Sequence, residues 1–152
     1  MRLTSRGELA LKAMIELAKA EAGPDPGLSA AEIARRCRAS VKFLEHVLSV
    51  LRSGGYVVSR RGRTGGYRLA REAKSIPVGE ISRLIDGPLA PAPCASVSQH
   101  RACDWCDSEA DCDLRAVWVR VREAIAEVMD SVTLADLVLE ARSRARADRY
   151  AI

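Results

Sequence analysis

The sequence predicts a mainly α-helical fold that carries one small β-hairpin. Three observations support this prediction: apolar residues recur at three- and four-residue steps, two short Tyr- and Val-rich runs flank a glycine-rich turn, and a sustained apolar stripe follows residue 113. The chain has 152 residues, 48% of them hydrophobic. This length suits one ordinary domain, or a small domain with an appended element, and the apolar content suffices for a core.

The first half of the chain predicts three helices. An amphipathic pattern from about residue 3 to 22 predicts the first, and GPDPG at 23–27 ends it. Ser29, followed three residues later by Glu32, is a capping-box signature that opens a short second helix. After a tight turn, SVKFLEHVLSVLR predicts a third helix with one apolar face formed by Val41, Leu44, Val47, Leu48 and Leu51. Two short helices joined in this way form a helix-turn-helix.

Two strands are predicted after the third helix. YVVSR and YRLAR are joined by RGRTGG, whose glycines permit the positive φ angles of a tight hairpin turn. Three helices and a hairpin make a winged helix-turn-helix over residues 1–75. Pro77 then starts a connecting helix within 76–87, which DGP at 86–88 stops.

The last third of the chain predicts a long dimerisation helix. Residues 113–147 contain an apolar stripe and a last helix capped by Thr133 and Asp136, and residues 148–152 are expected to form a tail within a frayed RSRARADRY end. A stripe on a long helix beside a small domain needs burial. It can pack within the chain or against a second subunit, and we favour the second because palindromic DNA sites reward two-fold dimers. The stripe consists of Leu114, Val117, Trp118, Val121, Ile125, Val128 and Met129.

Charge is distributed unevenly along the chain. Residues 1–75 carry 15 Lys and Arg against 7 Asp and Glu, whereas residues 76–152 carry 9 against 13. A basic half favours docking of a polyanion, most simply double-stranded DNA, and an ordinary solvated surface is the alternative. Charged residues interrupt the first twenty positions, and no apolar run is long enough to span a bilayer. We therefore expect a soluble cytoplasmic protein without a membrane partner.

The third helix supplies the first candidates for DNA contact. The second helix of a helix-turn-helix enters the major groove, so its early exposed residues are expected to reach base edges or phosphates: Ser40, Lys42, Phe43, Glu45 and His46. Phe43 has a core position as its alternative. Glu45 either discriminates bases by accepting from a cytosine amine or is a solvated helix charge.

The hairpin supplies the second group of candidates. Its arginines lie within nine positions, and the glycines of RGRTGG allow close approach to a narrow minor groove. A merely solvated basic loop is the alternative. Lys42 and Arg52 are expected to contact phosphates without sequence preference. The hairpin arginines are Arg60, Arg61, Arg63 and Arg68.

Four cysteines within residues 88–112 form a candidate metal site, with the spacing Cys-x8-Cys-x2-Cys-x5-Cys. Without a secretory signal, such thiols favour metal or redox chemistry over a disulfide framework. Zinc sites prefer two C-x2-C pairs and only one exists here, so an iron-sulfur cluster, [2Fe-2S] or [4Fe-4S], fits better, with zinc as the alternative. The four are Cys94, Cys103, Cys106 and Cys112, and Trp105 between two of them could shield the site from water. The fifth, Cys37, is expected to be a small core residue.

Together these motifs resemble the Rrf-type family of bacterial winged-helix regulators, which includes IscR, NsrR, RirA and CymR. The resemblance extends from RLTSRGELALKAMIELA, through FLEHVLSVLRSGGYVVSRRGRTGGYRLAR and the cysteine loop, to TLADL. It implies homodimers that bind palindromic operators, with the long helix as the dimer interface and a cluster close to it.

The resemblance also implies roles for individual residues. It assigns base contact to Ser40 and Glu45 and minor-groove insertion to Arg61, and it matches the pair Cys106-x5-Cys112 to the last two cysteine ligands. Glu8 matches a position where some members supply a carboxylate from the partner's first helix, and a solvated charge is its alternative. The family pattern usually has three cysteines, and some members place a ligating histidine where this chain has Arg115. An all-cysteine ligand set is therefore plausible here.

These features predict a homodimeric transcriptional regulator that senses iron-sulfur status, redox state or nitric oxide through a cluster in the cysteine loop. One alternative is a winged-helix regulator with structural zinc or no metal. Another is an iron-sulfur electron carrier, which leaves the arginine-rich wing unexplained. The sequence contains no Gly-rich dinucleotide loop and no nucleophile-base pair, so an enzyme is not expected.

Overall fold

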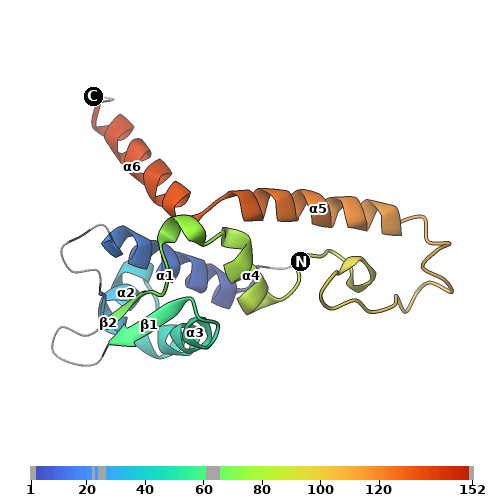
Figure 1. Ribbon diagram of the computed structural model, residues 1–152, viewed down its shortest axis with the longest axis horizontal. Helices are drawn as coiled ribbons and strands as arrows, with labels where there is room; N and C mark the ends of the chain where they lie inside the picture. Colours follow the sequence, from blue (N-terminus) through green and yellow to red (C-terminus); the bar gives the residue numbers. More distant parts are fainter. Residues whose placement is uncertain (1–2, 22, 24–26, 61–65, 151–152) are drawn as a thin grey trace.

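A computed structural model of the chain describes residues 3–21, 23, 27–60 and 66–150. A compact head contains the first four helices and the hairpin, while a long helix and the cysteine loop extend to one side (Figure 1). The elements are α1 (Ser5–Glu21), α2 (Ala30–Cys37), α3 (Val41–Ser53), β1 (Val57–Arg60), β2 (Gly66–Leu69), η1 (Ala73–Ser75), α4 (Val78–Asp86), η2 (Pro93–Ala95), α5 (Arg115–Ser131) and α6 (Leu134–Tyr150). Within the described residues, no helix is both long and apolar enough to cross a membrane.

The core lies where α1 meets α2, α3 and α4. Its largest fully buried side chains include Met14 and Leu17 of α1 together with Ile33, Leu44 and Ile81 from the three other helices. Cys37 is half-buried and packs against this core, as expected for a small apolar residue. The first helix starts at Ser5, so Leu3 precedes it and is 50% exposed.

The helix-turn-helix is shaped by two serine caps and one unusual turn residue. Ser29 Oγ accepts from the Glu32 N–H at 3.1 Å, and Ser40 Oγ accepts from the Phe43 N–H at 3.3 Å. Arg38 ends α2 in the left-handed region, with φ 55°, and its N–H donates to Ala34 O and Arg35 O. Residues other than glycine seldom adopt this backbone conformation, so the contacts around Arg38 must stabilise the turn between α2 and α3.

The apolar face of α3 agrees with the prediction except at its start. Leu44, Val47, Leu48 and Leu51 are each fully buried. Val41, predicted on the same face, is 42% exposed. It is the first of three exposed residues that open α3, and the core contacts begin only one turn later.

The hairpin pairs β1 with β2 in antiparallel register, from Val57 opposite Leu69 to Arg60 opposite Gly66. Leu28 joins the second strand as an isolated bridge: its N–H donates to Tyr67 O at 3.0 Å and its carbonyl accepts from Tyr67 N at 2.8 Å. A Cβ atom at Gly66 would lie 2.7 Å from Leu28 O, so glycine is required where the backbones meet.

Helices α5 and α6 connect to the head through a short backbone bridge. Val78 N donates to Val132 O at 2.9 Å, and Leu134 N donates to Ile76 O at 3.0 Å. Thr133 and Asp136 form the expected cap, since the Thr133 N–H donates to Asp136 Oδ2 at 2.9 Å and the Asp136 N–H donates to Thr133 Oγ1 at 3.3 Å.

Helix α6 reaches Tyr150, so the frayed end expected for RSRARADRY and for a tail from residue 148 is not found as far as Tyr150. Alanine and arginine are strong helix formers, which explains the extension.

Candidate nucleic-acid interface and cysteine loop

The outer face of α3 presents the residues that were expected to meet DNA. Lys42, Glu45, His46 and Arg52 are exposed, on the side opposite the four buried residues. Side chains three and four positions apart on a helix lie on one face, so Lys42, Glu45 and His46 form a polar strip that the exposed Ser49 continues to Arg52. A strip of this width on a helix that follows a tight turn is suited to the major groove.

Two further residues flank this strip at the start of α3. Ser40 is exposed, and although its oxygen caps the helix, its hydroxyl can still donate a hydrogen bond outward. Phe43 is 41% exposed, so the alternative core position is wrong. An exposed apolar side chain beside the groove-facing residues can meet a thymine methyl group.

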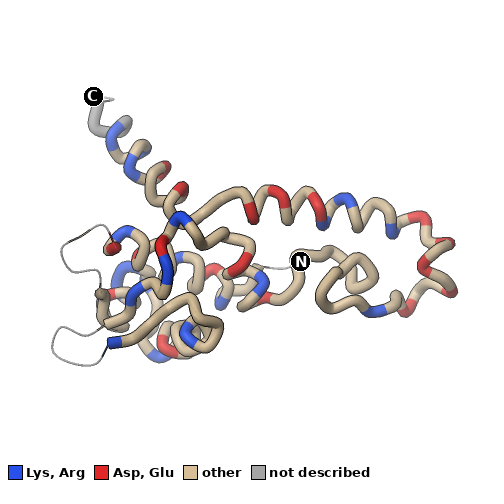
Figure 2. Tube along the Cα trace, viewed as in Figure 1, with Lys and Arg blue, Asp and Glu red and all other residues tan. Residues whose placement is uncertain are grey.

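The hairpin places basic residues on the same head. Arg60 ends β1 and Arg68 lies in β2, and both are exposed. Arg61 and Arg63, predicted to insert into the minor groove, lie outside the described residues. The head carries many of the chain's Lys and Arg positions, whereas acidic residues gather along the cysteine loop at the far end (Figure 2).

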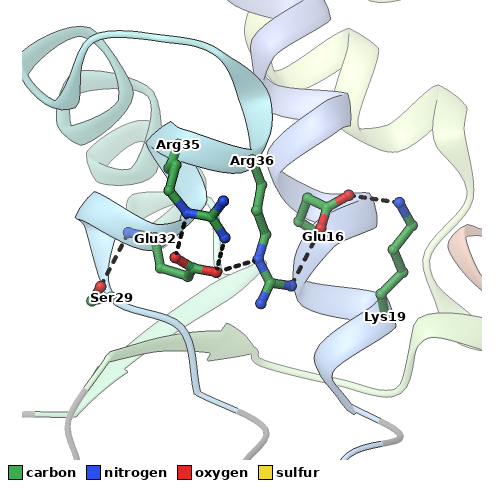
Figure 3. A network of polar contacts seen from close by, with 6 residues as sticks. All are labelled: Glu16, Lys19, Ser29, Glu32, Arg35 and Arg36. Carbon is green, nitrogen blue, oxygen red and sulfur yellow. Dashed lines mark hydrogen bonds and ion pairs between the residues drawn. The ribbon is translucent and has the colours of Figure 1, made fainter.

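An ion-pair network that was not predicted joins α1 to α2 (Figure 3). Arg35 Nη2 lies 2.8 Å and Arg36 Nε 2.7 Å from Glu32 Oε1, and Arg36 also reaches Glu16 at 3.4 Å. Hydrogen bonds from Arg35 and then Arg36 lower the pKa of the Glu32 carboxyl to about 2. The Glu32 side chain therefore pairs with its neighbouring arginines. Of the predicted capping box, the contact from the Glu32 N–H to the Ser29 side chain is formed. In AEIARRC the arginines follow Glu32 by three and four residues, and this spacing is the sequence signal that could have predicted the ion pairs.

Three of the four candidate cysteine ligands lie in one irregular loop before α5. Cys106 Sγ donates to Cys112 Sγ at 3.5 Å, and the Cys106 N–H lies 3.5 Å from Cys103 O. The thiols of Cys112 and then Cys103 raise the pKa of Cys106 to about 12. The backbone N–H of Leu114, followed by the Cys106 thiol, lowers the pKa of Cys112. Cys112 is thus the more readily ionised thiol of the pair, and Cys106 is the one that donates.

The cysteine pair has a geometry that suits a tetrahedral metal. Two thiolates bound to one ion through bonds of about 2.3 Å lie about 3.8 Å apart, close to the separation of Cys106 and Cys112. Thiolates are also the donors that iron-sulfur clusters use. However, in the part of the chain that the structure describes, no three His, Cys, Asp or Glu side chains are close enough together to hold a metal ion.

The fourth candidate, Cys94, has a different environment. It lies in η2 and is only 4% exposed. The next residue in η2, Ala95, accepts at its carbonyl from Arg122 Nη1 of α5 at 2.8 Å. Cys94 is therefore held in a turn against α5, rather than in the loop with the other three.

Glu109 closes the cysteine loop across its base. Its carboxylate oxygens lie 3.0 Å from His100 Nε2 and 3.2 Å from Arg115 Nε. These contacts join a residue ahead of Cys103 to the first residue of α5. Trp105, expected to shield the site from water, is 94% exposed, because the turn between Cys103 and Cys106 directs it outward.

Glu8, the expected carboxylate ligand from a second subunit, lies on the exposed side of α1. Its carboxylate pairs with Lys12 Nζ at 2.6 Å, and the two side chains are 56% and 55% exposed. An exposed pair of this kind holds its partners weakly. The carboxylate thus remains accessible to another molecule.

The protein has an exposed recognition helix, a basic hairpin beside it and a long helix that follows a cysteine loop in the sequence. These features define the class of winged-helix DNA-binding regulators. Residues 3–140 match the Rrf2 family, described as an iron-dependent transcriptional regulator, and the chain belongs to this family.

Named relatives and solved structures agree with this assignment. An HTH-type transcriptional regulator of Rhodobacter capsulatus, named rrf2-like, is 42% identical over 90% of this chain and 91% of its own. The structure of CymR, the global cysteine regulator of B. subtilis, superposes with a TM-score of 0.75 at 35% identity, covering 92% of this chain and 98% of CymR. The structure of T. potens IscR gives a TM-score of 0.69 at 33% identity, covering 93% and 88%. The family relatives are named as transcriptional regulators rather than enzymes, as predicted.

Proposed function

We propose that the protein is a homodimeric transcriptional regulator that binds a palindromic operator and whose cysteine loop holds an iron-sulfur cluster. The observation that carries the proposal is the pair of thiols 3.5 Å apart in a loop that leads directly into a long helix without a single buried residue. The loop supplies soft donors, and the helix supplies a surface through which two DNA-binding heads can be joined.

The exposed face of α5 supports the dimer. Apolar side chains on one face of this 17-residue helix, Val117, Val121 and Val128, are 37% to 63% exposed, and Leu114, just before the helix, is 56% exposed. Arg120, Glu123 and Glu127 border a shallow groove on this helix. A second copy provides an identical apolar stripe with charges of both signs at its edges, which a two-fold axis brings together. It also repeats the recognition helix, as a palindromic half-site requires.

The DNA contacts divide into two kinds. In this proposal Ser40, Glu45 and His46 read base edges, and Lys42 and Arg52 contact phosphates. Arg60, with Arg61 and Arg63 beyond it, extends the contact to the minor groove. The phosphate contacts determine affinity and its dependence on salt, while the base contacts determine the operator sequence.

Cys103, Cys106 and Cys112 would hold the cluster, with Cys94 or the Glu8 of a second copy completing the set. A bound cluster supplies a redox-active centre that oxygen or nitric oxide can alter. Without it, the Cys106 thiol donates to Cys112 Sγ, and Glu109 keeps the loop closed between His100 and Arg115. Cys94 is buried in η2, so its participation requires a rearrangement against α5.

Regulation then requires that the cluster-bound and cluster-free forms differ in their affinity for DNA. The loop is continuous with α5, which begins three residues after Cys112. A change in the loop therefore acts first on α5, and through α5 on the spacing of the two heads.

Anaerobic purification tests the proposal. We expect a brown protein that absorbs in the visible and contains iron and sulfide, and we expect Cys106→Ala to lose most of both. Cys37→Ala is the matched control, because Cys37 packs against the core away from the loop. A colourless protein that contains zinc and no sulfide contradicts the cluster and favours structural zinc.

A further inference from the structure

Helix α4 binds the base of the wing through one carboxylate. Glu80 Oε2 accepts from the Tyr56 hydroxyl at 3.0 Å and also pairs with Arg71 Nη2. Tyr56 directly precedes β1 and Arg71 follows β2 by two residues. The Arg71 guanidinium carbon lies 5.2 Å from the centre of the Tyr56 ring. Glu80 thus holds together the two ends of the hairpin.

The same helix is fixed to α5 by a second ion pair. Arg83 Nη1 donates to Asp130 Oδ1 at 2.7 Å and Nη2 donates to Oδ2 at 2.6 Å. This two-pronged geometry sets the relative orientation of the two side chains more strictly than a single contact. A Cβ atom at Gly79 would lie 2.0 Å from Asp130 Oδ1, so α4 approaches α5 as closely as only glycine allows.

A third contact fixes the end of α4 to α1. Asp86 accepts from the backbone N–H of Thr4 at 3.3 Å and from the Thr4 hydroxyl. A Cβ atom at Gly7 would lie 1.9 Å from Asp86 Oδ2, so glycine again permits the approach. Helix α4 therefore has one acidic or basic side chain for each of three neighbours: the wing, α5 and α1.

The wing also packs against the core of the head: Val57 of β1 is buried, and Tyr67 and Leu69 of β2 pack against the core. Its strands have four residues each, and Leu28 adds only an isolated bridge. A two-stranded hairpin of this size is marginal by itself. Its position relative to α3 therefore depends on its contacts with the head, which include the contact of Glu80 at its base.

We propose that Glu80 is a positioning residue for the wing and that α4 couples α5 to it. A shift of α5 moves Asp130, Arg83 follows it, and the displaced α4 carries Glu80 and the base of the hairpin. This inference rests on the proposed function, because the wing must contact DNA for its position to matter. It adds a route by which the state of the cysteine loop reaches the arginines of the wing as well as the spacing of α3.

Operator affinity tests the inference, measured by anisotropy with a duplex that the wild-type protein selects from a random library. We expect Glu80→Gln to bind roughly tenfold more weakly, because it removes the charge from a carboxylate that accepts hydrogen bonds at the wing base. Glu72→Gln is the matched control, since it removes the same charge from an exposed residue that pairs with Lys74 at 2.7 Å. Charge alone predicts tighter binding for both variants. Weaker binding by Glu80→Gln is opposite to this charge effect and therefore indicates that the wing has been displaced.

A double-mutant comparison separates positioning from general destabilisation. We expect Arg60→Ala to weaken wild-type binding by roughly tenfold but the Glu80→Gln protein by only about twofold, since the misplaced wing has already lost the contact. Lys42→Ala on α3 should weaken both backgrounds by the same factor. Equal Arg60→Ala effects in both backgrounds, or a Lys42→Ala effect that shrinks as well, would overturn the inference. If wild-type protein selects no duplex, the proposed function fails instead.

Discussion

The head and the long helix α5 carry similar amphipathic patterns, yet only in the head are the apolar faces buried by other parts of the chain. Every predicted apolar position of α3 except Val41 is fully buried, whereas α5 has no buried residue over 17 positions. The head therefore contains the partners that its own apolar residues need. Helix α5 exposes a stripe that no described part of the chain buries. An amphipathic pattern predicts a helix and its apolar face, but it does not indicate which molecule covers that face.

The largest expected effect is a core truncation in the head. Leu44→Ala should lower the free energy of unfolding by about 2–5 kcal/mol, because it leaves a cavity at a fully buried position. Val58→Ala is the control, at a position 39% exposed in β1, and should change it by less than about 0.5 kcal/mol. Urea denaturation at fixed protein concentration measures both. Equal effects would show that the head does not have the core described above.

The next effect concerns the exposed stripe of α5. Val121→Asp should weaken self-association by about 3 kcal/mol or more, since it places an unpaired carboxylate in an apolar interface. Ala116→Asp is the control, because it adds the same charge on a side of the helix well away from the stripe. Sedimentation at several concentrations measures the change. A Val121→Asp protein that stays dimeric would exclude this stripe as the interface.

A smaller effect is expected on DNA binding outside the base contacts. Arg52→Ala should weaken binding to every duplex by about the same factor and reduce the slope of log affinity against log salt by about 0.9. Glu45→Ala should instead relax the preference at one base pair, with a similar salt slope. A titration series in potassium chloride distinguishes the two. An unchanged slope for Arg52→Ala would remove this residue from the phosphate contacts.

The smallest effect is on the acid sensitivity of the α1–α2 network. The folded pKa of Glu32 is about 2, against an ordinary 4.5, so its pairs with Arg35 and Arg36 stabilise the fold above pH 4.5. That contribution is lost as the pH falls from 4.5 towards 2, because the carboxylate becomes protonated. Glu32→Gln should therefore lose less of its urea midpoint between about pH 6 and about pH 3 than the wild type. Glu140→Gln, a charge-matched variant on α6, should match the wild type, and equal losses in all three would contradict the role of Glu32.

The sequence predicted the features that depend on near neighbours along the chain. Ser29 and Thr133 cap the helices that their spacing indicated, and the two strands of the hairpin coincide with the runs that predicted them. The predicted burial of Val41 was wrong because a periodic pattern does not reveal where along a helix the core contacts begin. The suggested shielding of the cysteine site by Trp105 was wrong because the sequence near a residue does not indicate how its side chain is oriented in an irregular loop.

Contacts between distant segments had no signal in the sequence. Glu80 lies 24 residues from Tyr56, and Arg83 lies 47 from Asp130, so neither pair forms a motif. The cysteine spacing predicted a metal site but did not reveal that Cys94 lies apart in η2. The proposed ligand set includes a bound cluster and a second subunit, neither of which the order of residues in one chain specifies.

The most direct test of the account is operator affinity measured on one anaerobic preparation before and after the cluster is removed with a chelator. We expect the affinities of the two forms to differ at least about tenfold at the same salt concentration, the size of a typical allosteric coupling. The loop variant Cys106→Ala should behave like the stripped protein in both states. Equal affinities for the loaded and stripped forms would contradict the claim that the cysteine loop controls DNA binding.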